Sequence, residues 1–541
     1  MGPDIVATST RSPAARNRYI YYPDHLVRMP GPVPGAGLLR NLFSNFSILF
    51  TEPLFKGTIS GMLAEPAVDP RPPAVEDESV GVFIKRRFGK PMTENLVSAF
   101  LHGIYAGDLY KLSARTLFPQ LWHLETMDTG IVGSLFDNMW NGRSLVSYEQ
   151  LNFLVQMSHL QMSQLKPPGQ QLADVLTPLT GASVYTFKRG LGQLITRLES
   201  VLRDMPNVTI KTSTNAHSMH FERETKTIAL ATTPSSGEEP IRHDYVVSTI
   251  SPNALIGVMA SPSQPGGASA SPVRLLSALS DTAPPSVNVM VVNLFYSDPN
   301  LLRYRGFGYL LPRSVPLEQN PERALGVIFG SETSTSDQRV VGKVDLDMGS
   351  REGRLKPEDV AKAFAFAEEE AKATPRPAQD SAKGTKLTVM LGGHWWEGWD
   401  PDADLPNEES AIQMARSLLE RHLGITGMPI VAKARLARNA IPQYQVGYHR
   451  AMGTVHENLL QDFGGRLKVV GPAYQGAVGV NDCVKAATSL ALGLKEGWDG
   501  DGRTGLEGFK DGDGMDIGKE RWIVVDRSGE VLRESIRGKQ D

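Results

Sequence analysis

Residues 471–493, GPAYQGAVGVNDCVKAATSLALG, have the types and spacing that could bind an anionic group. The apolar run 467–470 predicts a short buried strand directly before this stretch. Three glycines among the next nine residues leave the loop backbone bare and free to adopt positive φ. Asn481 and Asp482 are good helix N-cap residues, and apolar residues follow at mixed helical spacing until Gly493. The stretch therefore predicts a strand, a tight glycine loop and a helix.

The N-terminus of such a helix carries unpaired backbone N–H groups and a partial positive charge. Phosphates bind at such termini, and the anionic edge of another ligand can be held in the same way. Glycine spacing alone nevertheless favours an ordinary strand-to-helix turn without a ligand. The identity of the residues around the glycines is what changes this balance.

Residues 474–476 are Tyr-Gln-Gly, and residues 478–483 are Val-Gly-Val-Asn-Asp-Cys. This sequence strongly resembles the C-terminal flavin motif of the protoporphyrinogen oxidase family. In that family the Val-Gly-Val step lies against the flavin. The resemblance therefore implies FAD as the cofactor, with Val478, Gly479 and Val480 in contact with it.

The resemblance extends through most of the chain and implies a site for a tetrapyrrole. HGIYAGD at 102–108 is close to the family's glycine-rich turn, whose backbone faces the substrate, and GFGYLLP at 306–312 and TVMLGGHWW at 388–396 also follow the family pattern. By this resemblance the substrate contacts are Gly103 and the apolar wall residues Phe307, Leu310 and Met390. Without the resemblance, plain core packing explains each wall residue about equally well.

A tetrapyrrole dicarboxylate is a flat apolar disc with two propionates, so its site needs at least one cation. The family uses an arginine in the segment after a Leu-Pro pair. Arg40 is the expected partner, and Arg28 is the alternative because extra prolines loosen the alignment. No catalytic side chain is expected, since flavin accepts hydride and the protein supplies orientation and electrostatics. We interpret His102 as a loop or helix-end histidine.

Strand–helix–strand alternation over residues 183–256 predicts part of an α/β nucleotide-binding domain. Residues 208–231 read as three short strands, and residues 243–250 read as another. The resemblance places the loop near Ala216 against the adenine half of FAD. A literal GxGxxG at 500–505 has no preceding strand and is crowded by aspartate, so we interpret it as a coincidence.

The family begins with a strand, a GxGxxG loop and a helix that hold the FAD pyrophosphate, and no such element precedes Arg18. Loss of that central strand would split the sheet and expose apolar edges. We expect an incomplete chain, and a chain that does not hold FAD stoichiometrically as it stands. The alternatives are a non-catalytic fragment without stable FAD, or another flavoenzyme of the amine-oxidase fold. The segments 102–108 and 306–312 argue against the second alternative.

Composition indicates an ordinary soluble globular protein. The chain is 41% apolar and 21% charged, as is usual for this class. Its length of 541 residues suggests two to four domains. The net charge of −3 gives no nucleic-acid signature, and the lysines and arginines are scattered among acids. A single cysteine, Cys483, excludes internal disulfides and a cysteine metal cage, and no metal is expected. No apolar run is long enough for a transmembrane helix.

The fold class that these patterns and the resemblance imply is mixed α/β. It comprises a Rossmann-like FAD domain lacking its N-terminal part, a sheet-floored substrate domain and a helical membrane-docking domain. The expected boundaries are 1–37 for a strand and loop segment, 38–182 for the helical membrane-docking domain, 183–256 and 436–497 for the FAD domain, 257–435 for the substrate domain with an exposed insertion at 333–386, and 498–541 for a C-terminal extension. Within that extension, residues 522–536 read as a hairpin turned at Ser528-Gly529.

Residues 38–63 are apolar with few charges, which suits helices buried in protein or resting on a bilayer surface. The family docks its helical domain on a membrane at this point. The resemblance implies oxidation of protoporphyrinogen by oxygen in haem biosynthesis, peripheral association with the mitochondrial inner membrane, and a possible homodimer. The first residues are similar in composition to a transit peptide but are short and interrupted by prolines.

Overall fold

The structure is a computed structural model, and it describes most of the chain. The described residues are 4–10, 12–31, 48–147, 153, 182–232, 240–260, 273–334, 339–340, 374–375, 379, 382–496, 502–509 and 522–525. The insertion predicted at 333–386 lies almost entirely outside them, as does Arg40. No helix among the described residues is both long enough and apolar enough to cross a membrane.

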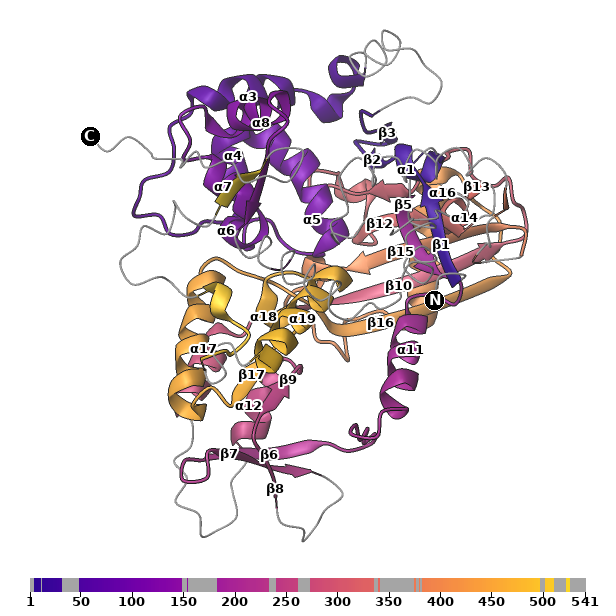
Figure 1. The fold of residues 1–541 in the computed structure, drawn as a ribbon. Helices are drawn as coiled ribbons and strands as arrows, with labels where there is room; N and C mark the ends of the chain where they lie inside the picture. Colours follow the sequence, from indigo (N-terminus) through magenta and orange to yellow (C-terminus); the bar gives the residue numbers. More distant parts are fainter. Residues whose placement is uncertain are drawn as a thin grey trace, which may run out of the picture.

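A seven-stranded sheet in the order β16-β10-β15-β12-β11-β2-β3 is the largest sheet of the described residues (Figure 1). Its strands are β2 (Tyr19–Tyr21), β3 (Leu26–Arg28), β10 (Ser286–Tyr296), β11 (Gly308–Leu310), β12 (Ala324–Phe329), β15 (Thr385–Gly392) and β16 (Val431–Pro442). Neighbours pair antiparallel, except that β11 pairs parallel with β2. The strands predicted at 287–295, 306–312 and 324–332 are confirmed.

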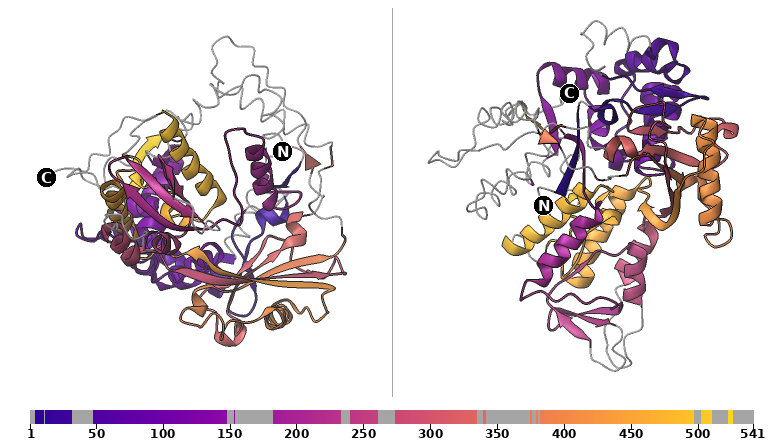
Figure 2. Two further views of the ribbon diagram at one scale, coloured as in Figure 1. Left: turned by 90° about the horizontal axis from the view of Figure 1, so that it is seen from below. Right: turned by 90° about the vertical axis from the view of Figure 1, so that its right-hand side faces the viewer.

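One face of this sheet packs on helix α16 (Glu408–Leu423). Alternate side chains of β15 point toward α16. These are Leu387, Val389 and Leu391, which are fully buried in the core that they share with that helix. Met390 points the other way and packs in a separate, smaller cluster. The sheet therefore offers a second, less covered face, on the opposite side from α16 (Figure 2, left).

The helical part consists of short helices packed at one end of the sheet. They are η2 (Pro53–Phe55), α3 (Thr58–Ala64), η3 (Glu65–Ala67), α4 (Val80–Pro91), the π-helical turn η4 (Met92–Val97), α5 (Ser98–Ile104), α6 (Ala114–Leu117), α7 (Pro119–Leu124) and α8 (Gly130–Trp140). The sequence ESVGVFIKRRFG at 78–89 predicts an amphipathic helix with an acidic cap, but the N-cap of α4 is Ser79, whose hydroxyl accepts from the Val82 N–H at 3.2 Å.

Buried ion pairs hold these helices together. The guanidinium of Arg87, on α4, pairs with the carboxylate of Glu65, and both side chains are almost completely buried. Glu65 also accepts the backbone N–H groups of Ile131 and Val132 at 2.9 Å, in the first turn of α8. A carboxylate suits that position because the N-terminus of a helix carries partial positive charge. One carboxylate therefore joins η3, α4 and α8.

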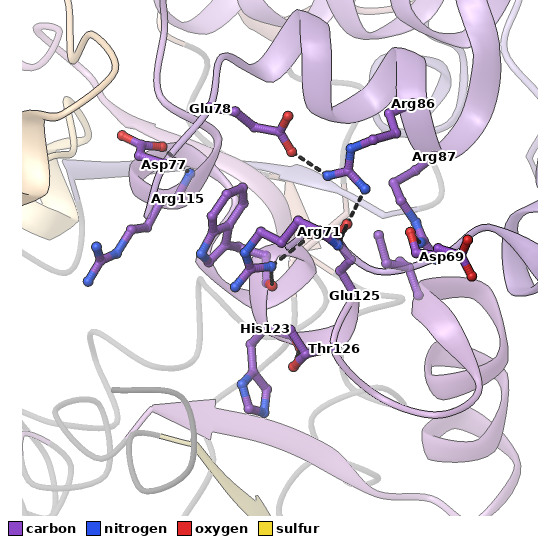
Figure 3. Close-up of polar contacts among 12 residues, drawn as sticks. Asp69, Arg71, Asp77, Glu78, Arg86, Arg87, Arg115, His123, Glu125 and Thr126 are labelled. Carbon is purple, nitrogen blue, oxygen red and sulfur yellow. Dashed lines mark hydrogen bonds and ion pairs between the residues drawn. The ribbon is translucent and has the colours of Figure 1, made fainter. Parts of the chain in front are cut away.

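A second cluster in Figure 3 centres on Glu125, whose carboxylate is fully buried. It accepts from Arg71 at 2.8 Å and also from Arg86, whose guanidinium bridges to Glu78. The Arg71 guanidinium additionally stacks 3.7 Å from the ring of Trp122. With every charge paired, this network fixes the loop before α4 against α7.

The remaining elements form a smaller α/β part built around a parallel pair of strands, β9 and β17. They are β9 (Val246–Ser248), β17 (Leu467–Val469), α12 (Pro252–Ala260), α13 (Val273–Thr282), α17 (Tyr448–Phe463), α18 (Pro472–Gln475) and α19 (Val480–Glu496). A separate three-stranded sheet contains β6 (Ala216–Glu222), β7 (Thr227–Thr232) and β8 (Ile241–His243). The three strands predicted within 208–231 are therefore wrong in part: residues 208–215 pair with no strand, because β-propensity without a partner edge makes no strand.

Strand β1 (Ile5–Ser9) was not expected from the sequence. It pairs antiparallel with β5 (Ala182–Phe187), which leads into α11 (Gly192–Arg203). Several apolar side chains of the described residues are exposed, including Val247 on β9 at 43%, Val484 on α19 at 52% and Ile195 on α11 at 64%.

Helix α19 was expected to end at Gly493, but it continues to Glu496. A Cβ added at Gly493 would lie 2.5 Å from the Arg503 side chain, so this glycine permits close packing of the C-terminal segment. That segment is held by Lys468, which is fully buried and donates to the carbonyls of Gly465 and Arg503. The residues after 500 therefore contribute to this part of the core.

The first strand of the hairpin predicted at 522–536 is confirmed, and the hairpin pairing itself stays a prediction. Strand β18 (Trp522–Val525) pairs antiparallel with β4 (Ser144–Ser147), almost four hundred residues earlier in the chain. The predicted turn at Ser528-Gly529 lies outside the described residues. A local turn signal cannot reveal a distant partner strand.

Candidate functional site

Three buried tyrosine hydroxyls hold the glycine loop that leads to α19. Tyr444 donates to the Pro472 carbonyl at 2.7 Å, and Tyr448 donates to the Ala473 carbonyl at 2.8 Å. Tyr474, within the loop, donates to the Ile250 carbonyl at 3.1 Å. Burial raises the pKa of all three phenols far above the ordinary value, so they stay protonated donors. The loop is therefore rigid before any ligand arrives.

The N-terminus of α19 presents unpaired donors at the end of this loop. The carbonyl of Gly479 accepts from the N–H groups of Asp482 and Cys483 at 3.1 Å each. The N–H groups of Val480 and Asn481 have no acceptor among the described residues, and the Val480 side chain is 49% exposed. A Cβ added at Gly479 would lie 2.6 Å from the Asp482 carboxylate, so a larger residue here would displace that side chain.

These groups fit the anionic N1–C2=O edge of a flavin. Two free N–H groups and the helix dipole attract negative charge, while Val478 and Val480 supply apolar contact. Tyr185 on β5 donates to the Asn481 side chain at 3.4 Å, which brings a second element to the same point. Ala216 is the first residue of β6, in the separate three-stranded sheet, and is exposed. Its predicted contact with the adenine half of FAD stays a prediction.

The structure brings Gly103, Leu310 and Met390 to one region of the sheet. Gly103 lies in the last turn of α5, and a Cβ added there would lie 2.8 Å from Leu310 Cδ2. A Cβ added at Gly326 on β12 would lie 2.9 Å from the same side chain, and Gly326 pairs with Met390 on the neighbouring strand β15. Leu310 also packs against a small core cluster, so its side chain serves the fold as well.

Phe307 lies just before β11, at the other end of the same segment. Its N–H donates to the Asn17 carbonyl at 3.0 Å, and its ring is 5.6 Å from the Arg18 guanidinium. Of the two arginines considered for the substrate carboxylate, Arg28 ends β3 and donates to the Asn17 side chain at 3.3 Å. Arg40 lies outside the described residues. The choice between these arginines therefore stays a prediction.

His102 forms a hydrogen-bonded pair with His394 that joins the elements of this region. His102 Nδ1 lies 2.6 Å from the Leu311 carbonyl, and the two Nε2 atoms are 2.8 Å apart. A carbonyl only accepts, so His102 donates through Nδ1 and accepts through Nε2 from His394. Burial lowers the pKa of His102 to about 4 and of His394 to about 3, so both rings are neutral at pH 7.

The pair connects the three elements that carry the predicted substrate contacts. His102 adjoins Gly103 on α5, Leu311 adjoins Leu310, and His394 follows the end of β15. The His394 N–H also donates to the Ala106 carbonyl at 2.7 Å. The interpretation of His102 as a helix-end histidine is confirmed for its position, and its partner could not be read from the sequence. The aromatic context of His394, GGHWW, was the only signal.

Metal chemistry finds no support in the part of the chain that the structure describes, which has no group of three or more His, Cys, Asp or Glu side chains able to hold an ion. Cys483 is partly buried in the first turn of α19, and burial raises the pKa of its thiol. A thiol with a raised pKa is a poor nucleophile.

Residues 6–323 match the family described as flavin containing amine oxidoreductase, over more than half of the chain. The chain belongs to this family. It is 29% identical over 497 residues to protoporphyrinogen oxidase of Schizosaccharomyces pombe, covering 91% of this chain and 81% of the relative. It is 25% identical over 483 residues to protoporphyrinogen oxidase of Homo sapiens, covering 89% and 80%. The resemblance first seen at residues 474–483 is thus confirmed over most of the chain.

A solved bacterial structure from Exiguobacterium sp. 255-15, provisionally named protoporphyrinogen oxidase, has the same fold. It matches with a TM-score of 0.55 at 18% identity and covers 91% of this chain and 82% of that chain. The mixed α/β fold class predicted from the sequence is confirmed, and this is an oxidoreductase fold that carries a flavin.

Proposed function

We propose that this chain oxidises protoporphyrinogen to protoporphyrin with FAD as cofactor and oxygen as electron acceptor. The observation that supports the proposal is that the chain has both kinds of site this reaction needs. Free N–H groups at the start of α19 suit the flavin, and the apolar wall around Gly103, Leu310 and Met390 suits the substrate. The curated relatives named protoporphyrinogen oxidase, which match over most of the chain, support the choice of substrate.

When FAD is bound, its flavin supplies the hydride acceptor, and oxygen removes the electrons. The side chains are then asked to bind and orient the substrate rather than to react with it. The N–H groups of Val480 and Asn481 hold negative charge at the flavin edge. The apolar wall holds the disc flat, and the neutral His102–His394 pair fixes the relative positions of α5, β11 and β15.

A flavoenzyme of the same fold with a different substrate is the competing hypothesis. It would share the α19 loop and could share the packing of Gly103 against Leu310. The names of the relatives favour the tetrapyrrole.

We also propose that the helical part rests on a membrane surface. Helix α8 exposes Phe136, Met139 and Trp140 by 58%, 68% and 77%, and Leu63 on α3 is 78% exposed. Such a group of exposed apolar side chains suits a bilayer surface. The mitochondrial inner membrane and a homodimer are the location and assembly that the resemblance suggests, and both are part of this proposal.

The activity is tested with freshly reduced protoporphyrinogen IX, by following protoporphyrin fluorescence after the protein has been incubated with FAD. The wild type is expected to accelerate the reaction, against the expectation from the sequence alone that this chain does not hold FAD stoichiometrically, because the family match supports a flavin cofactor. Gly103→Val should lower kcat/KM by about 10- to 100-fold, because the added atoms collide with Leu310. Gly257→Val is the matched control, since nothing lies within 4 Å of a Cβ at that position. A wild-type protein that binds FAD but does not oxidise the substrate would overturn the proposal.

A further inference from the structure

Strand β16, at the edge of the seven-stranded sheet, carries three cationic side chains. Lys433 pairs with Glu408 at 3.1 Å, and Arg438 pairs with Asp402 at 2.8 Å. Arg435, between them, is exposed and has no acidic or hydrogen-bonding partner among the described residues. The strand therefore presents one cation that is available to a ligand.

The packing of its neighbours shows which face of the sheet carries Arg435. Ala434 and Leu436 pack in the core shared with α16. Because successive side chains of a strand alternate between faces, Arg435 lies on the face opposite α16. Val291 and Met390 pack together on that same face.

Strand register places Arg435 and Met390 in one row across the sheet. Arg435 pairs with Val291, Val291 pairs with Met390, and Met390 pairs with Gly326. Neighbouring strands are about 4.8 Å apart, so the Cα atoms of Arg435 and Met390 are separated by roughly 10 Å. An extended arginine side chain covers much of that distance.

The row is apolar along most of its length and cationic at one end. At the end opposite Arg435, Leu310 pairs with Gly326, and Gly103 lies close to the Leu310 side chain. A flat apolar ligand lying along this row would have its rim beside the guanidinium. A guanidinium binds a carboxylate through two parallel hydrogen bonds, which fixes orientation as well as charge.

We propose that Arg435 binds a carboxylate of the substrate at the rim of the sheet, as a specificity-determining residue separate from Arg40 and Arg28. The inference rests on the proposed function, because it takes the substrate to be a flat dicarboxylate. Because the two propionates of this substrate stand on neighbouring rings at one edge of the disc, Arg435 serves that edge.

The test compares Arg435→Gln with Lys433→Gln, a control on the same strand and face whose lysine already has an acid partner. KM and kcat are measured with protoporphyrinogen IX and with its dimethyl ester. Arg435→Gln should raise KM for the diacid about 10- to 100-fold with kcat within about twofold, and Arg435→Lys should restore part of the affinity. The ester and the Lys433→Gln control should change little.

A second measurement needs no turnover. Binding of protoporphyrin IX and of its dimethyl ester is followed by fluorescence quenching for the same variants. Arg435→Gln should weaken binding of the diacid alone, by the same 10- to 100-fold. Equal changes for diacid and ester, or no change for either, would overturn the role of Arg435. A wild type that binds the diacid more tightly than the ester but does not oxidise its reduced form would instead overturn the proposed function.

Discussion

At the scale of single residues, the His102–His394 pair makes a prediction about pH. Burial lowers the pKa of His102 to about 4, below the ordinary value of 6.5. The folded protein therefore keeps His102 neutral where the unfolded chain would take up a proton. This contribution to stability is complete above pH 6.5 and is lost as the pH falls toward 4, by roughly 3 kcal/mol at most.

Chemical denaturation of the wild type and of His102→Gln between pH 7.5 and 4 measures this effect. The variant should lose less stability on acidification, because it no longer carries the imidazole that resists protonation. His217→Gln, at an exposed position on β6, serves as the control and should follow the wild type. If all three proteins lose stability in parallel, the neutral pair does not form in solution.

Residue types near the flavin loop could be predicted because they act locally. The glycines, the Asn481-Asp482 cap and the strand before them are neighbours in sequence, and the structure confirms that order. The tyrosines that pin the loop could not be predicted, because Tyr444 and Tyr448 reach it from a different segment. The pairing of His102 with His394 spans 292 residues, and no local pattern records it.

At the scale of elements, α8 makes a prediction about membrane contact. Phe136, Met139 and Trp140 are spaced along one side of the helix, and the rings of Phe136 and Trp140 stack at a centroid distance of 6.1 Å. Replacing both Met139 and Trp140 by serine removes a large part of this apolar surface. Binding to phosphatidylcholine vesicles should then fall about tenfold or more, at roughly 25 cal/mol per Å² of lost apolar burial.

Co-sedimentation with the vesicles measures the bound fraction. Met428→Ser is the control, since Met428 is 70% exposed but lies in the turn between α16 and β16. The control should bind like the wild type. Vesicle binding that is equally strong in the double variant would mean that another surface meets the membrane.

Element boundaries show where sequence patterns fail and why. Gly493 looked like a helix end, yet it lies inside α19 because Arg503 packs against it from the C-terminal segment. Residues 208–215 looked like strand, yet they have no partner edge. The buried strands β10 and β12 were predicted correctly, because a short apolar run indicates a buried strand whichever strand it pairs with.

At the scale of the whole molecule, one carboxylate links the helical part to the flavin-loop part. Asp77 precedes α4 and accepts from the Ser113 hydroxyl at 2.9 Å and from the Gly447 N–H, at the start of α17, at 2.8 Å. The Arg115 N–H adds a third contact at 3.3 Å (Figure 3). Two backbone bonds cross the same junction beside it, from Ser113 to Tyr444 at 2.8 Å and from Val446 to Lys111 at 3.1 Å.

Replacing Asp77 by alanine should therefore loosen this junction rather than a single loop. Hydrogen bonds to a charged group contribute about 1.5–3 kcal/mol each, so we expect a loss of that order in the free energy of unfolding. Hydrogen exchange is the decisive measurement, because the Ser113 and Val446 amides do not bond to Asp77 themselves. Both should exchange faster in the variant if the carboxylate holds the two parts together. Asp137→Ala, which removes a carboxylate that bonds only within its own helix end, should leave them unchanged. Wild-type protection of Ser113 and Val446 in Asp77→Ala would show that the backbone bonds alone maintain the junction.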